Sequence, residues 1–210
     1  MIREHLDEWV VLDIETVASP DVADLLDPVK APANYKDPAK IAAYCEEKRL
    51  EQIARAGLEA DLCEIVAIGF QINHQPVSAW TRHILSEEAL VRCVCENIGN
   101  RQIVGFALLA FDLPILIRRS QLLGIPVPEI SLDRYRTPHL DVLERLTFNG
   151  RLTMRSLAFY CRRFGIPSTN GTTGADIAGL VAANDWAAVE AHVRADVEKT
   201  AALAHRLGWC

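Results

Sequence analysis

The sequence predicts an α/β fold in which a mixed β-sheet is flanked by helices. Short apolar runs of strand length lie mainly in the first half of the chain, at 10–14, 65–72 and 102–106. Segments with helical periodicity and capping residues dominate the second half. The composition, with 50% hydrophobic and 24% charged residues in a chain of 210, is ordinary for a globular protein. We therefore expect one domain, 1–210, with strands early and helices late.

The first expected strand, 10–14, ends in two acids. Asp13 and Glu15 are two residues apart, so on a strand both side chains point to the same face. Carboxylates this close repel each other unless a cation lies between them. Oxygen ligands of this kind suit hard divalent ions such as Mg²⁺ or Mn²⁺. The alternative is a strand end whose acids simply face water, and further acids elsewhere in the chain decide between the two.

The next segment is expected to be a helical excursion at about 17–62. It opens without clear periodicity. Asp37 and Pro38 then fit the N-cap and first position of a helix that ends at Gly57. Because this helix carries many charges of both signs, we expect it to be a solvated peripheral element rather than part of the core.

The remaining elements follow from periodicity and capping residues. The runs at 65–72 and 77–82 are separated by a turn, which predicts an antiparallel pair. A short element is expected at about 139–146, where Asp141 reads as a helix cap. The expected helices are 86–97 after Ser86, 112–123 starting at Asp112, 154–164 after Thr153, 175–183, and 186–207 after Asn184 or Asp185.

Charge and hydropathy exclude some classes of protein. The formal net charge of −6 argues against a strong nonspecific binder of duplex nucleic acid, which is usually basic. It does not exclude a nuclease, because acids that hold metal ions lower the net charge. No apolar run approaches the roughly 20 residues of a membrane helix. The first residues lack the basic start and apolar stretch of a signal peptide, so we expect a cytoplasmic protein.

Three further residues can join the two acids of the first strand. Asp112 follows the strand at 102–106 and begins a helix, where it can be an N-cap, a metal ligand or both. His192 and Asp196 are four residues apart, so they lie one turn apart on one face of the last helix. In isolation, that pair would read as a surface His–Asp contact.

The order of these residues resembles the DEDD superfamily of 3′–5′ exonucleases. The resemblance is closest to the predicted exonucleases related to the proofreading domain of family B DNA polymerases, and it extends over most of the chain. The segments that carry it are Asp13-Ile14-Glu15-Thr16, Ile65 to Phe70, Gly105-Phe106 with Phe111-Asp112-Leu113-Pro114, Thr173 to Ile177, and Asp196-Val197-Glu198-Lys199-Thr200.

This resemblance implies a ribonuclease H-like fold and a metal-dependent 3′–5′ exonuclease. Two ions per site, Mg²⁺ or Mn²⁺, would catalyse hydrolysis at the 3′ end of single-stranded nucleic acid, with DNA the expected substrate, and release 5′-mononucleotides. The implied metal ligands are Asp13, Glu15, Asp112 and Asp196.

Other candidate residues concern the proton and the substrate. His192 is the expected general base. Thr16 and Phe111 belong to the motifs and are candidate substrate-binding residues. Arg151 and Arg155 flank the expected start of the helix at 154–164, where a helix N-terminus attracts phosphate, although such arginines are commonly plain surface charge.

Two positions depart from the family pattern. The second motif commonly has Asn after Gly-Phe, where this chain has Ala107. The third motif takes the form Tyr-x3-Asp or His-x4-Asp. In this chain three residues separate His192 from Asp196, so a His has the spacing of the Tyr form, and the pattern does not decide which residue is the general base. One alternative is an exoribonuclease or short-oligonucleotide nuclease, because the sequence does not identify contacts to the 2′-OH, which distinguish RNA from DNA. The other alternative is a noncatalytic domain that binds nucleic acid or a protein partner. The sequence does not identify protein partners.

Overall fold

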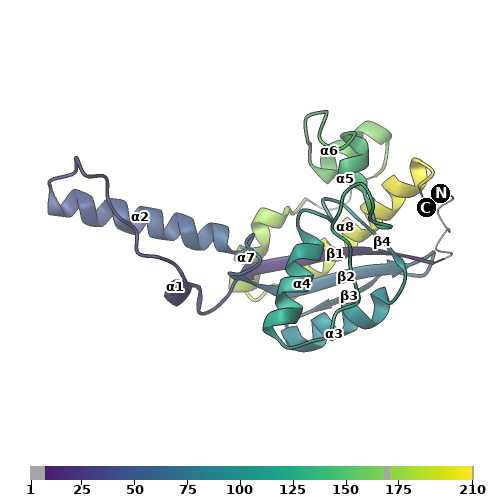
Figure 1. Ribbon diagram of the computed structural model, residues 1–210, viewed down its shortest axis with the longest axis horizontal. Helices are drawn as coiled ribbons and strands as arrows, with labels where there is room; N and C mark the ends of the chain where they lie inside the picture. The colour runs from purple at the N-terminus through teal and green to yellow at the C-terminus, as the bar shows by residue number, and fades with distance from the viewer. Residues whose placement is uncertain (1–7, 168–170, 210) are drawn as a thin grey trace.

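The computed structural model describes residues 8–167 and 171–209 (Figure 1). Its strands are β1 (Trp9–Ala18), β2 (Cys63–Ile72), β3 (Ser78–Thr81), β4 (Gln102–Gly105) and β5 (Leu140–Asp141). They form one sheet in the order β3-β2-β1-β4-β5. β2 runs antiparallel to both β1 and β3, whereas the β1–β4 and β4–β5 pairs are parallel. The sheet is therefore mixed, as predicted, and β1 lies at its centre.

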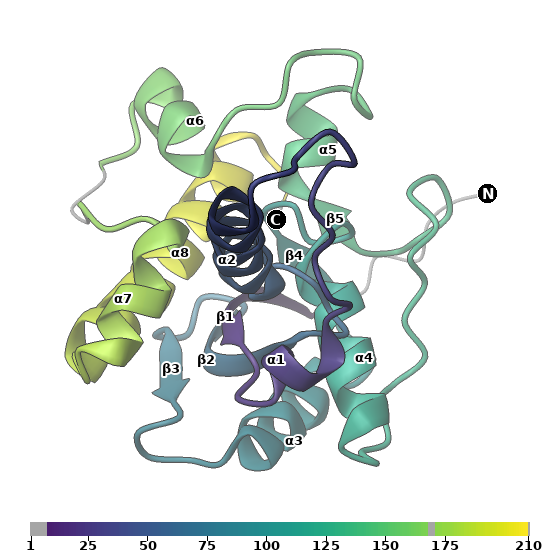
Figure 2. The same ribbon diagram turned by 90° about the vertical axis from the view of Figure 1, so that its left-hand side faces the viewer.

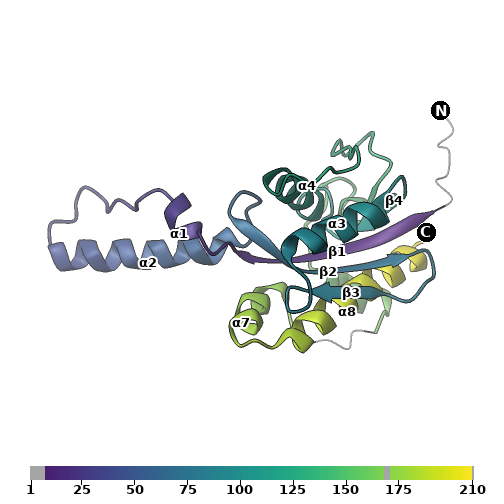
Figure 3. The same cartoon turned by 90° about the horizontal axis from the view of Figure 1, so that it is seen from below.

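Helices cover both faces of this sheet. Figure 3 shows α3 and α4 on one face and α7 and α8 on the other. Within the described residues, no helix is both long and apolar enough to cross a membrane. The helices are α1 (Val22–Leu25), α2 (Pro38–Ala56), α3 (Glu87–Ile98), α4 (Asp112–Leu122), α5 (Val142–Leu146), α6 (Leu157–Phe164), the 3-10 helix η1 (Gly174–Asp176), α7 (Ile177–Ala182) and α8 (Trp186–Arg206).

Alternation along β1 divides the core into two layers. Val10, Leu12 and Ile14 are buried with the apolar residues of α3 and α4. Val11 points the other way and is buried with apolar residues of α6 and α8. Asp13 continues the Val11 side of the strand, so the acids of β1 face α8, where a core residue would otherwise lie.

Helix α8 approaches the sheet closely at Gly69. This residue lies opposite Asp13 in the β1–β2 ladder. A Cβ at Gly69 would lie 2.9 Å from Cγ2 of Val197 and 3.1 Å from the carbonyl oxygen of Val193. The first distance is shorter than carbon atoms normally allow and the second is unusually tight, so the missing side chain lets α8 pack next to Asp13 without a shift.

Several predicted boundaries are confirmed at their caps. The carboxylate of Asp37 accepts from the N–H of Ala39, and Ser86 accepts from that of Ala89. For the last helix, Asp185 rather than Asn184 is the cap, because its carboxylate accepts from the N–H of Ala188. These caps satisfy backbone donors that have no partner within the helix.

Two predicted boundaries are wrong, and one short helix was not predicted. The helix expected after Thr153 begins at Leu157 and is capped by Ser156. Met154, the expected first residue of this helix, is 65% exposed, whereas Leu157 is buried. Strand β1 continues to Ala18, beyond the expected end at 14, because β2 pairs with it over this whole length. The excursion expected to open irregularly also contains the short helix α1.

Helix α2 forms an arm with the segment that precedes it. Figure 1 shows both projecting from the rest of the molecule, and Figure 2 looks along them. The helix buries only Ala56, at its root. The guanidinium of Arg49 donates to the backbone carbonyls of Ala23 and Leu26, and this holds the two parts of the arm together. The prediction of a solvated peripheral element is therefore confirmed.

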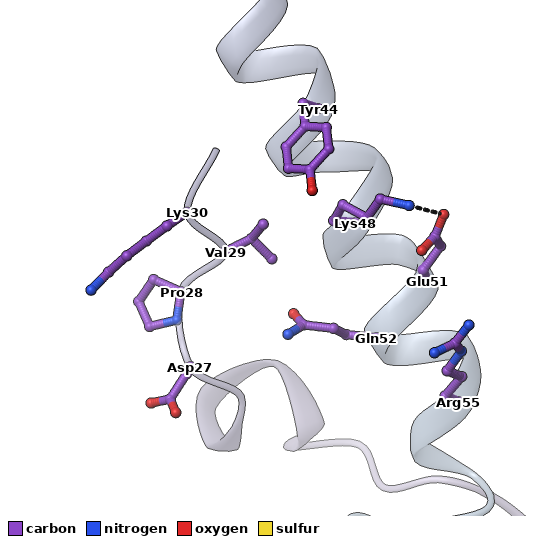
Figure 4. A pocket seen from close by; sticks show the side chains of 9 residues that line it. All are labelled: Asp27, Pro28, Val29, Lys30, Tyr44, Lys48, Glu51, Gln52 and Arg55. Carbon is purple, nitrogen blue, oxygen red and sulfur yellow. Dashed lines mark hydrogen bonds and ion pairs between the residues drawn. The ribbon is translucent and has the colours of Figure 1, made fainter. Parts of the chain in front are cut away.

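A groove of about 700 Å³ separates the helix of the arm from residues 27–30 (Figure 4). Charged groups of both signs line it. One exposed pair lies on its helical side, with Nζ of Lys48 2.6 Å from Oε1 of Glu51. A pair this exposed contributes little to stability.

We expect the arm to be dispensable for folding. Replacing residues 27–52 with a short Gly/Ser linker removes no fully buried side chain and leaves Val22 and Ala56 in place. The shortened chain should unfold cooperatively, with a melting temperature within about 3 °C of wild type, because surface changes away from the core shift stability by less than about 0.5 kcal/mol each. Circular dichroism melting checks this. Loss of a single cooperative transition would show that the arm belongs to the core.

Candidate active site

Residues from both ends of the chain meet beside β1. The Nε2 atom of His192 lies 3.1 Å from Oε1 of Glu15 and 3.9 Å from Oδ2 of Asp196. The structure therefore joins the first strand to the last helix, as the predicted site requires. Electrostatic coupling extends the group further, since the charges of Glu15, Asp112 and Asp196 all act on Asp13.

Asp112 reaches this group from the start of α4. The β1–β4 ladder ends at the pair Val11 and Val104. The N–H of Ile14 therefore lies past the end of the part of β1 that pairs with β4. Oδ1 of Asp112 accepts a hydrogen bond from this N–H at 3.0 Å. The N-cap position of α4 is held by Phe111, without a side-chain cap. The alternative of Asp112 as an N-cap is therefore wrong, and its carboxylate is fixed at the backbone of Ile14, the residue between the two acids of β1 in the sequence.

Burial makes this carboxylate group unstable in its fully ionised form. Burial raises the pKa of Asp13 well above its usual value, and the charges of Glu15, Asp112 and Asp196 raise the pKa further. Burial also raises the pKa of Glu15 and, well above its usual value, that of Asp112. Oδ2 of Asp13 is buried and has no hydrogen-bond partner among the described residues. Such an oxygen costs free energy until a donor or a cation reaches it.

His192 is held by groups on both sides of its ring. Its Nδ1 atom lies 2.9 Å from the hydroxyl oxygen of Thr172, while Nε2 faces Glu15. Burial lowers the pKa of His192, but the hydrogen bond and negative charge of Glu15, with the charge of Asp196, outweigh burial and raise the pKa overall. The ring is therefore oriented for proton exchange at Nε2.

Lys199 also belongs to the site, although the sequence analysis did not single it out. Its Nζ atom lies 2.6 Å from Oδ1 of Asp196. It follows Asp196 by three residues, so the helical spacing alone places both on one face of α8. That spacing was the signal that could have identified it.

The carboxylate oxygens of the site are suitable ligands for a divalent cation, although their side chains are not arranged around a position for one. Hard ions prefer carboxylate oxygens, and the unpartnered Oδ2 of Asp13 is such an oxygen. Among the described residues, no three His, Cys, Asp or Glu side chains are arranged to hold a metal ion. Cationic or hydrogen-bonding groups of the protein instead contact two of the carboxylates, His192 at Glu15 and Lys199 at Asp196.

The candidate substrate-binding residues lie at different distances from this group. The hydroxyl of Thr16 donates to the carbonyl of Gly57 at 2.5 Å, which ties β1 to the root of the arm. Phe111 packs against the core at the start of α4. Arg151 and Arg155 are exposed, and the guanidinium of Arg155 lies 5.6 Å from the ring centroid of Phe159. No interaction found among the described residues joins these arginines to the carboxylates, and their role stays a prediction.

Ala107 and Asp141 shape the loop that leads to Asp112. Ala107 has a φ of 60°, in the left-handed region that Asn tolerates better than Ala. Asp141 accepts from the N–H groups of Leu143 and Glu144, which confirms it as a helix cap, and from the N–H of Leu109 in this loop. The carboxylate of Asp141 therefore holds the loop that positions Asp112.

Comparisons with known proteins agree with this arrangement. Residues 58–207 match a family model described as a predicted 3′–5′ exonuclease related to the exonuclease domain of PolB. That range contains Asp112, His192 and Asp196, whereas Asp13 and Glu15 precede it. No curated protein sequence matches the chain significantly.

A solved structure of similar fold extends the comparison to nearly the whole chain. It is the family B DNA polymerase from the hyperthermophilic archaeon Pyrobaculum calidifontis, with a TM-score of 0.61 and 17% sequence identity. The match covers 95% of this chain and 24% of the polymerase, so the chain spans about a quarter of that protein's length. The likeness confirms the predicted ribonuclease H-like fold.

Because its pKa is raised on folding, Asp13 should destabilise the metal-free protein at neutral pH. For such an acid, stability is present below the unfolded pKa near 3.8 and is lost as the pH rises through the folded value. In EDTA at pH 7.5, Asp13→Asn should therefore raise the melting temperature by about 2–4 °C, the shift for about 1 kcal/mol in a chain of this size. This gain should shrink as the pH falls toward 4.

Asp176→Asn provides a control of opposite sign. Hydrogen bonds from the backbone and side chain of Thr173 lower the pKa of Asp176. Its stabilising contribution is present at neutral pH and is lost as the pH falls, so Asp176→Asn should lower the melting temperature at pH 7.5. A lower melting temperature for Asp13→Asn than for wild type in EDTA would instead make Asp13 a structural residue.

Proposed function

The chain belongs to the family of predicted 3′–5′ exonucleases related to the exonuclease domain of PolB, and we propose that it hydrolyses phosphodiester bonds at the 3′ end of single-stranded nucleic acid. The reaction would depend on divalent metal ions and release 5′-mononucleotides. The proposal rests on one observation. Carboxylates from β1, α4 and α8 act on Asp13, one oxygen of which is buried and has no partner in the described ranges 8–167 and 171–209.

Each carboxylate has a place in this reaction. Asp13 would be the shared ligand, because the other three acids act on it electrostatically. Glu15 and Asp196 would hold one ion together with Asp13, and Asp112 would hold the other. When bound, two such ions lower the pKa of the attacking water and stabilise the leaving oxygen. Without cations the carboxylates would repel the phosphate of the substrate.

His192 would take the proton of the attacking water. Nε2 already faces the carboxylates of Glu15 and Asp196, while Thr172 contacts Nδ1 and fixes the orientation of the ring. A base in this position typically contributes about 10²–10⁴ in rate. Loss of a metal ligand should cost more, because the ion is lost with it.

We propose single-stranded DNA as the substrate. The structural neighbour is a DNA polymerase, which supports DNA over RNA, although its polymerase activity does not transfer to a chain covering 24% of its length. The terminal nucleotide would have to enter the acidic site unpaired. A labelled RNA strand of the same sequence is the direct comparison, because proteins discriminate RNA by the 2′-OH.

A noncatalytic nucleic-acid-binding domain is the second candidate. Two observations favour it. Glu15 and Asp196 are contacted by side chains of the protein itself, and Ala107 stands where the family commonly has Asn. Buried acids with raised pKa values weigh against it, because a domain with no use for cations would gain stability by losing them.

A cleavage assay separates the two candidates. A 5′-labelled single strand, incubated with Mn²⁺ or Mg²⁺, should shorten one nucleotide at a time from its 3′ end, and EDTA should stop the reaction. His192→Ala should slow single-turnover cleavage by about 10²–10⁴ while Mn²⁺ binding is retained. Asp196→Ala should lose both cleavage and most of the Mn²⁺ binding.

Glu190→Gln is the matched control for these variants. Glu190 lies on the same helix, and its carboxylate contacts Arg194 outside the site. The Glu190→Gln variant should cleave at the wild-type rate. Absence of any metal-dependent shortening by the wild-type protein, together with retained binding of the strand, would establish the noncatalytic candidate.

A further inference from the structure

Lys199 is an unusual residue for a site made of acids. Only 8% of its surface is exposed, and lysine is almost never this buried without a partner. Its ammonium lies 2.6 Å from Oδ1 of Asp196. The four-carbon stem thus brings a full positive charge to the place where the proposed function puts a metal ion.

The charge of Lys199 acts beyond Asp196. It counteracts the raised pKa of both Asp13 and Glu15, and it offsets part of the rise that burial causes in the pKa of the Cys161 thiol of α6. The ammonium is therefore close enough to offset part of the repulsion among the carboxylates. A single ammonium cannot satisfy all of them, however, and Oδ2 of Asp13 remains without a partner among the described residues.

We propose that Lys199 is a built-in counterion, which holds Asp196 when no divalent ion is bound and releases it when one binds. The proposal rests on the proposed function, because it takes Asp196 to be a metal ligand. Two consequences of opposite sign follow. Lys199 should stabilise the metal-free protein, and it should weaken metal binding, because the ion must compete with it for Asp196.

The chemistry of lysine suits this exchange. Its ammonium is a compact point charge on a flexible stem, so it can leave one carboxylate without disturbing the helix that carries it. A divalent ion can contact several carboxylates at once, including the oxygen of Asp13 that the ammonium leaves unpartnered. The ion should therefore displace Lys199, at the cost of the ion pair.

The chain offers a matched control for this pair. Lys48 and Glu51 on the arm have the same spacing of three residues and the same Nζ–O distance of 2.6 Å. The side chain of Lys48 is 36% exposed, compared with 9% for Lys199, and the arm carries none of the proposed metal ligands. Lys48→Met thus removes an equivalent charge outside the site.

The test measures melting temperature in EDTA and Mn²⁺ affinity by calorimetry, for wild type, Lys199→Met, Lys199→Arg and Lys48→Met. Lys199→Met should melt several degrees lower in EDTA and bind Mn²⁺ about tenfold more tightly, the factor that corresponds to about 1.4 kcal/mol. Lys199→Arg should stay close to wild type in both measurements, because it keeps the charge. Lys48→Met should change neither.

The outcomes separate this inference from the proposed function. Wild-type protein that binds no Mn²⁺ contradicts the proposed function itself. Wild-type protein that binds Mn²⁺, with Lys199→Met binding no more tightly, overturns the counterion proposal alone. If Lys199→Met does not fold, Lys199→Gln, which keeps a donor for Asp196 but no charge, replaces it with the same two expectations.

Discussion

The contact between α8 and the central sheet is the constraint on which the site depends. Gly69 has no side chain to hold the helix away, so Val193 and Val197 pack directly against β2. This contact lies opposite Asp13 in the sheet. The apolar residues of α8 therefore provide the burial energy that brings His192 and Asp196 to β1, against the repulsion of the carboxylates.

Burial and repulsion together explain the contacts inside the site. The sheet and α8 exclude water from Asp13 and Glu15, which raises the pKa values of both, and the protein offsets part of this cost with its own groups. His192 contacts Glu15, Lys199 contacts Asp196, and the N–H of Ile14 contacts Asp112. Within the described part of the chain, Asp13 has no equivalent partner for its buried oxygen, and so it is the point at which a cation would contribute most.

The sequence predicted the elements of this site better than their contacts. Alternation along β1 and the spacing of His192 and Asp196 correctly placed each pair on one face of its element, because such faces depend only on local geometry. The contact of Asp112 with Ile14 could not be predicted, because it depends on where the β1–β4 ladder ends. The ion pair of Lys199 depended on burial, which the sequence does not state, although its spacing from Asp196 was visible.

Anomalous diffraction from crystals of the wild-type protein soaked in Mn²⁺ tests the central claim most directly. The account predicts Mn²⁺ within about 2.0–2.2 Å of a carboxylate oxygen of Asp13, the range for small divalent ions such as Mg²⁺ and Zn²⁺, with Asp112 or Asp196 as a further ligand and Lys199 displaced from Asp196. The account would be contradicted if, at saturating Mn²⁺, no ion were bound at Asp13 and the ion pair of Lys199 and Asp196 stayed intact.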